Sequence, residues 1–180
     1  MWVCEGSRID WTAVAAIIAL AIWMVDGWRR RGERAATRRV LAQIMTTPVG
    51  LAQIEIAHFR TLVMPSTEDQ SIVLELMNSG EKRREFANKA LQVKFELPTQ
   101  FLDKADVFGQ RTSNRLAWAF SQTTRLHTMW RLFAETSDQV DDDEMGARLK
   151  HALVQIQETE QAIGEAFNAV LADGRASAWI

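Results

Sequence analysis

The chain has 180 residues, 47% of them hydrophobic, and a formal net charge of −2. This length supports one compact domain beside a short appendage and excludes two ordinary domains in addition to a membrane span. Only nine glycines and three prolines are present, too few for the regular turns of a β-sandwich or barrel, and a lone Cys4 cannot form an intramolecular disulfide. We therefore predict an all-α protein whose bulk is cytosolic.

The first predicted element is a transmembrane helix over residues 11–28. The apolar stretch from Ile9 to Trp28 has 20 residues, enough to cross a hydrocarbon core of roughly 30 Å. Trp11 stands at one end and Trp23 and Trp28 at the other, as expected of rings that prefer the membrane interface. The charges before the stretch and the lack of a small-residue cleavage site argue against a signal peptide. A buried soluble helix is the alternative, since it too is apolar on all sides.

A basic collar follows this helix. Residues 29–39 carry a net charge of +5, whereas the first ten residues sum to −1 and residues 40–180 to −5. The positive-inside rule then predicts an N-terminus outside and a C-terminal domain in the cytoplasm, at a cell membrane of the bacterial inner-membrane type. Anionic lipid head groups should attract the collar. Nucleic acid is not expected as a partner, because the run is short and lacks interleaved aromatic residues. The arginines assigned to the membrane interface are Arg29, Arg30, Arg31 and Arg34.

These elements imply an order of domains along the chain. Residues 1–10 are expected to be a short extracytoplasmic N-terminus, residues 29–46 a basic juxtamembrane helix, and residues 174–180 a tail. Residues 47–173 should form a cytosolic helical bundle with long antiparallel helices.

Proline and glycine punctuate the first helices of this bundle. The juxtamembrane helix should end at Thr46, because Thr47 as N-cap and Pro48 as first residue are typical of a new helix, which then runs to Met64. Ser66 should cap a third helix that ends at residues 78–80. Residues 91–97 alternate apolar and polar side chains as a strand does, but they also fit a helix. We predict a helix there, since no second strand is available for pairing.

Two long helices complete the predicted bundle. The first extends over residues 99–136, with a possible kink at Gly109 and a seam of residues at three-and-four spacing. An acidic loop at residues 141–144 leads to the last helix, which Asp173 and Gly174 should end. The seam comprises Leu102, Ala105, Leu116, Ala119, Thr123, Leu126, Trp130 and Phe133.

Catalytic and metal-binding motifs are weak in this sequence. Glu55 and His58 have the Glu-x-x-His spacing of carboxylate-bridged di-iron bundles, but a second such pair is missing around His127 and His151. His58 is better explained as a partly buried packing residue. Zinc spacing, glycine-rich phosphate loops and nucleophile elbows are lacking as well. We therefore predict no catalytic residue, metal or cofactor.

A basic stripe on the long helix is the candidate interaction surface. Arg111, Arg115, Trp118 and Arg125, with Gln122, recur at helical spacing roughly opposite the apolar seam. A tryptophan flanked by arginines is a common composition of binding hot spots. In the alternative interpretation Trp118 packs under a neighbouring helix and the arginines pair with residues 141–144.

The sequence leaves two classes of function open. The first is a single-pass membrane-anchored module that binds a protein partner or a second copy of itself. The second is a membrane-active effector or lysis protein that oligomerises through its transmembrane helix, where the small residues Thr12, Ala15, Ala16 and Ala19 would allow close approach. An enzyme ranks behind both.

Overall fold

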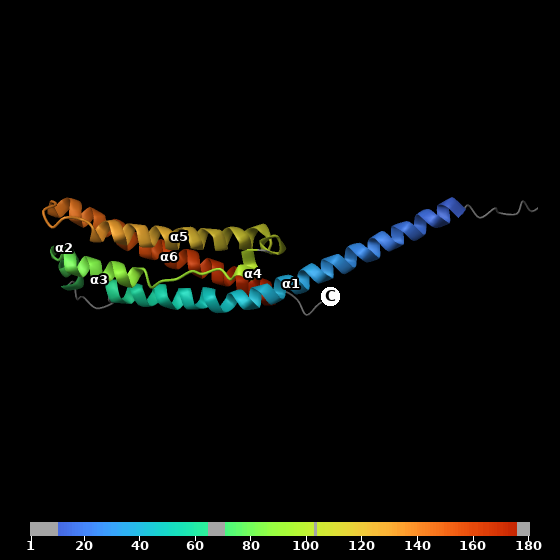
Figure 1. Ribbon diagram of the computed structural model, residues 1–180, viewed down its shortest axis with the longest axis horizontal. Helices are drawn as coiled ribbons and strands as arrows, with labels where there is room; N and C mark the ends of the chain where they lie inside the picture. The colour runs from blue at the N-terminus through green and yellow to red at the C-terminus, as the bar shows by residue number, and fades with distance from the viewer. Residues whose placement is uncertain (1–10, 65–70, 103, 176–180) are drawn as a thin grey trace, which may run out of the picture. The chain divides into compact units, whose positions relative to one another are not determined.

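A computed structural model describes residues 11–64, 71–102 and 104–175 (Figure 1). Every regular element in these ranges is helical, which confirms the predicted all-α class for the described chain. The elements are α1 (Trp11–Val63), α2 (Ser71–Asn78), α3 (Gly80–Ala90), α4 (Thr99–Leu102), the 3₁₀ turn η1 (Ala105–Val107), α5 (Gln110–Ala134) and α6 (Asp142–Arg175).

The chain divides into two compact units, Met1–Thr37 and Arg38–Ile180. In its described residues the first unit is the N-terminal part of α1. The second unit contains the rest of α1 and all the other helices.

In the second unit, α5 and α6 pack along each other in opposite directions (Figure 1). Arg115 near the start of α5 pairs with Glu165 late in α6, whereas Arg125 further along α5 pairs with the earlier Glu158. Helix α3 lies against α5, and α2 contacts both α3 and α6.

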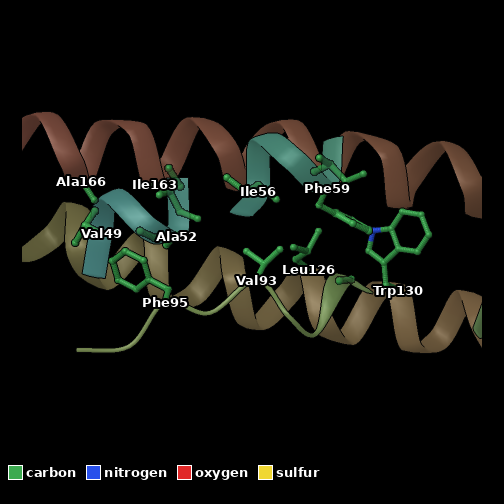
Figure 2. Close-up of a cluster of buried hydrophobic side chains, with 14 of the residues drawn as sticks. Val49, Ala52, Ile56, Phe59, Val93, Phe95, Leu126, Trp130, Ile163 and Ala166 are labelled. Atoms are coloured by element: carbon green, nitrogen blue, oxygen red, sulfur yellow. The ribbon is translucent and has the colours of Figure 1, made fainter. Parts of the chain in front are cut away.

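The core of this unit forms where α1, α5 and α6 face one another. Figure 2 shows α1 side chains pointing toward those of α5 and α6, with Val93 and Phe95 closing the cluster. Trp130 is its largest buried side chain, with ring centroids 5.1 Å from Phe59 and 5.8 Å from Phe133 in edge-on geometry. Such aromatic pairs contribute about 0.5–1.5 kcal/mol beyond the burial of their area.

The predicted break at Thr46 and Pro48 is wrong, because α1 continues through Pro48 to Val63. Proline costs about 3 kcal/mol in a helix interior relative to alanine. Met45, Val49 and Ala52 are nevertheless buried on both sides of Pro48. Packing of this face outweighs the cost, since most helix stability in proteins comes from tertiary contacts.

Residues 91–97 do not form the predicted helix. Helix α3 ends at Ala90, and the chain beyond Gln92 has no regular secondary structure up to Pro98. The apolar alternation is real, because Val93 and Phe95 are buried while Lys94 and Glu96 are exposed. Side chains replace a partner strand here: the Lys94 amide donates to the Glu55 carboxylate at 2.8 Å, and His127 Nε2 lies 2.9 Å from the Val93 carbonyl oxygen.

The limits of the two long helices also differ from the prediction. Helix α5 begins at Gln110 rather than at residue 99, and Gly109 is its N-cap instead of a kink. Helix α6 includes three of the four acidic residues, Asp142, Asp143 and Glu144, in its first turn and continues through Gly174 to Arg175. Carboxylates in a first turn are stabilised by the helix dipole, which explains why the run is helical. The predicted seam of α5 is confirmed at its buried positions Leu116, Ala119, Thr123, Leu126, Trp130 and Phe133.

The membrane candidate and the interaction surface

The N-terminal part of α1 carries large apolar side chains that are exposed. Trp23 and Trp28 are each 72% exposed, and the core begins only at Leu41. A helix whose apolar side chains point in all directions needs an apolar environment around it. Trp11 is the first residue of α1, but its side chain lies outside the described residues. The other exposed members are Ile17, Ile18, Leu20, Ile22, Met24 and Val25.

Among the described residues, one helix is long and apolar enough by length and composition to cross a membrane: the Val14–Val63 stretch of α1, near the N-terminus. Core helices of soluble proteins and signal sequences meet the same criterion. One third of the apolar segment that meets this criterion is buried in the structure. Because the buried residues of α1 begin at Leu41, this segment includes residues of the second unit. Hydropathy alone therefore does not single out the N-terminal part of α1, and the exposed side chains there are the more specific observation.

Four collar arginines, Arg29, Arg30, Arg31 and Arg34, are exposed, and two of these four are paired within the same helix, whereas Arg38 and Arg39 are half-buried. Arg29 Nε lies 3.0 Å from Glu33 Oε1, and Arg30 Nη2 lies 2.8 Å from Asp26 Oδ2. Both pairs have the i, i+4 spacing that contributes about 0.3–0.5 kcal/mol on an exposed helix. The Asp26 carboxylate at the end of the apolar stretch is thus paired. Arg31 and Arg34 are exposed beside these pairs.

The basic stripe of α5 follows the edge that faces α6. Arg115 Nη1 lies 2.6 Å from Glu165 Oε2, and Arg125 Nη1 lies 3.9 Å from Glu158 Oε2. Between them, Gln155 Nε2 donates to Gln122 Oε1 at 2.7 Å. The interpretation that these arginines pair with residues 141–144 is therefore wrong. A large part of the stripe's charge is compensated by α6.

Trp118 and Arg111 are the outward-facing members of the stripe. Trp118 is 37% exposed, so about two thirds of it is covered, and Arg111 is exposed at the start of α5. The accessible part of the stripe therefore includes Arg111 and about one third of Trp118.

Arg83 is a structural residue that the sequence did not reveal. Its side chain is fully buried, and Nη1 donates to the carbonyl oxygens of Leu76 and Met77, each at 3.1 Å. Nη2 donates to the Thr136 carbonyl oxygen at 3.0 Å and to the Asp138 carboxylate. Arg83 thereby ties the end of α2 to the loop between α5 and α6. Its position on a short charged helix resembles that of its exposed neighbour Arg84, so periodicity could not distinguish the two.

An open cavity of about 680 Å³ lies beside this junction, between α3 and the end of α5. Its charges are mixed, with Arg84 and Arg131 opposed by Glu135 and Asp138. Such a lining favours neither an anionic nor a cationic ligand.

Glu55 and His58 do not form part of a metal site in the described structure. Glu55 accepts a hydrogen bond from the Lys94 amide, and His58 is exposed rather than partly buried as predicted. The described residues contain no cluster of three or more potential ligands among His, Cys, Asp and Glu. The two side chains instead line a small hollow with Lys89 and Gln92.

Comparison with family models found no match, and comparisons with curated proteins and with solved structures found no significant match.

Proposed function

We propose that this protein is a single-pass membrane-anchored module whose helical bundle binds another protein at the cytoplasmic face. The observation that carries the proposal is the row of exposed apolar side chains on α1 up to Trp28, followed at once by exposed arginines. In water that row would leave several large apolar side chains unburied, at about 25 cal/mol for each Å². Lipid around residues 11–28 removes this cost.

The arginines give the proposed anchor a direction. Asp26 is paired with Arg30, so the cytoplasmic end presents net positive charge to the head groups. Each Lys or Arg near an anionic surface contributes about 1 kcal/mol of attraction. The rest of the chain is acidic, so the same surface repels the bundle and leaves its sides accessible to partners.

Trp118 is the residue that we assign to partner binding in this module. It is 37% exposed on a stripe that also carries arginines, and tryptophan and arginine are enriched in hot spots. The ion pairs of Arg115 and Arg125 with α6 hold that surface in place.

The topology can be tested with reporters fused after Ile180 in the full-length chain. A reporter that works only in the cytoplasm should be active, and one that works only after export should be silent. The same pair fused to a bacterial single-span protein of known opposite orientation is the control. Activity of the exported reporter would contradict the placement and favour the lysis alternative.

A further inference from the structure

Between residues 40 and 59, α1 is apolar on two opposite faces. One face belongs to the core and contains Met45, Val49, Ala52, Ile56 and Phe59 (Figure 2). The other face is exposed and has no element of the described chain packed over it. Its apolar members, with their exposed fractions, are Val40 (55%), Ile44 (45%), Leu51 (56%) and Ile54 (67%).

The exposed face has the spacing of a coiled-coil seam. Steps of four and three residues alternate along Val40, Ile44, Thr47, Leu51, Ile54 and His58, and all six are exposed. We call these six residues the outer seam. A repeat averaging 3.5 residues keeps one stripe directed at a single partner helix. Exposed apolar residues elsewhere in the second unit, such as Leu74 and Phe120, belong to other helices and do not continue this row.

The outer seam is also free of charge. Glu55 is the sole charged residue between Arg39 and Arg60, and its carboxylate is occupied by the Lys94 amide at 2.8 Å. Two identical copies of such a seam meet without like-charge repulsion. A strongly charged partner would gain little from it.

We propose that the outer seam binds the outer seam of a second copy of this chain, with the two α1 helices parallel. The self-matching pattern follows from the heptad spacing, since equivalent residues of parallel helices meet across the interface. The parallel direction rests on the proposed anchor, because two chains inserted in one membrane with the same topology point the same way.

The size of the seam indicates where this dimer forms. From Val40 to His58 the helix rises about 27 Å, and with a helix diameter of about 10–12 Å each copy offers roughly 300 Å². A standard stable interface buries about 800 Å² per partner. The seam is therefore too small for a tight dimer in dilute solution, whereas confinement in a membrane raises the effective concentration enough for a weak contact to form.

Disulfide trapping in native membranes tests the pairing. In a full-length Cys4→Ser background, single cysteines replace Ile44, Leu51 or Ile54 in the seam. The controls are Gln53→Cys, a half-buried position of α1 outside the seam and near Gly164 of α6, and Leu74→Cys, an apolar position on α2 that is as exposed as Leu51. Mild oxidation should give disulfide-linked dimers at the three seam positions at least tenfold faster than at the controls, because a disulfide requires Cβ atoms about 3.5–4.5 Å apart.

A charge placed in the seam is the second measurement. Leu51→Glu should lower cross-linking through Ile54→Cys at least tenfold, while Leu74→Glu leaves it unchanged. Both leucines are 56% exposed, so circular dichroism should show the same helix content in both variants.

Cross-linking that is equal at seam and control positions, or absent from the seam in the membrane fraction, would overturn the pairing. Failure of the anchor gives a different result, since the chain would then fractionate with the soluble proteins. In that case the same cysteines are oxidised in concentrated purified protein. Faster cross-linking at the seam than at the controls would support the dimer although the anchor is wrong. Equal cross-linking at all positions would refute the dimer.

Discussion

Two tryptophans of the same helix, α5, differ in how far their side chains are buried. Trp130 is fully buried between Phe59, Phe86 and Phe133, whereas Trp118 is 37% exposed. The three-and-four spacing of the sequence already placed Trp130 in the seam and Trp118 on the stripe. The degree to which Trp118 is covered could not be predicted, because it depends on neighbours distant in the sequence.

Alanine substitutions should separate these roles. Trp130→Ala removes a fully buried aromatic and should destabilise the fold by about 3–5 kcal/mol. For Trp118→Ala we expect a loss of about 1–2 kcal/mol, because part of its area is already in contact with water. Thermal unfolding of the detergent-solubilised full chain, followed by circular dichroism, measures both.

Trp118→Ala should in addition weaken partner binding by about 2 kcal/mol or more, the scale of a hot spot. Equal losses of stability for the two tryptophans would place Trp118 in the core and end its assignment as an interaction residue.

Arg83 stabilises the second unit through backbone contacts more than through its ion pair. The carboxylate of Asp138 is 67% exposed, so water already screens that charge. Arg83→Met should cost about 3 kcal/mol or more, because it leaves the carbonyl groups of Leu76, Met77 and Thr136 without their donor at about 1–3 kcal/mol for each buried group. Unfolding in urea measures this loss.

Two control variants separate the backbone contacts of Arg83 from its charge and its ion pair. Arg84→Met removes an exposed neighbour and should change stability by less than about 0.5 kcal/mol. Asp138→Asn should cost less than about 1 kcal/mol, as for other exposed ion pairs. A loss in Asp138→Asn as large as that in Arg83→Met would show that the ion pair, and not the backbone contacts, holds the junction.

At the scale of elements, periodicity predicted which residues are buried better than it predicted where helices end. The buried face of α5 agrees with its three-and-four spacing. These positions repeat because one side of a helix must face the core. Fold class and the buried face of α5 were therefore accessible from the sequence, whereas the apolar residues Ile44, Leu51 and Ile54 of α1 repeat at helical spacing and are nevertheless exposed.

The predicted ends of helices were wrong where tertiary packing outweighed the preference of a local residue such as proline. Pro48 signalled a new helix, but burial of the residues around it keeps α1 continuous. Residues 91–97 fitted both helix and strand, and Glu55 and His127, which bond to Lys94 and Val93, lie more than 30 residues away. Arg83 was missed for the same reason, since Thr136 and Asp138 are more than 50 residues away. Contacts between residues so far apart in the sequence depend on the tertiary fold, and the sequence around each residue does not indicate them.

On α3, charge patterning acts locally and could be read from the sequence. Hydrogen bonds from Lys89 and Lys82 lower the pKa of Glu85, and the hydrogen bond to Glu85 raises the pKa of Lys82. A carboxyl group with a lowered pKa contributes stability above its unfolded pKa, and this contribution disappears as the pH falls through the folded value. Because these three side chains lie at the surface and are each about 34–42% exposed, the pairs support α3 without defining a site.

At the scale of the whole molecule, charge is separated along the chain. Residues 29–39 carry a net +5 and residues 40–180 a net −5. The positive segment follows the apolar stretch directly, and the outer seam begins immediately after it. In the proposed membrane protein the apolar stretch anchors the chain and the positive segment keeps the C-terminal domain in the cytoplasm. The outer seam then brings the α1 helices of neighbouring copies together.

Neutralising the collar should loosen the orientation of the anchor without removing it from the membrane. In the triple variant Arg29→Gln, Arg30→Gln, Arg31→Gln, the bias of positive charge that sets topology falls by three, while the apolar stretch remains unchanged. We expect cytoplasmic and exported reporters fused after Ile180 both to be active, which indicates a mixed population. The control removes three exposed arginines far along the chain, Arg84, Arg111 and Arg131, and should keep a single orientation. If both triple variants behaved like the unaltered chain, the collar would not determine topology, and its arginines would be left with lipid attraction alone as their proposed role.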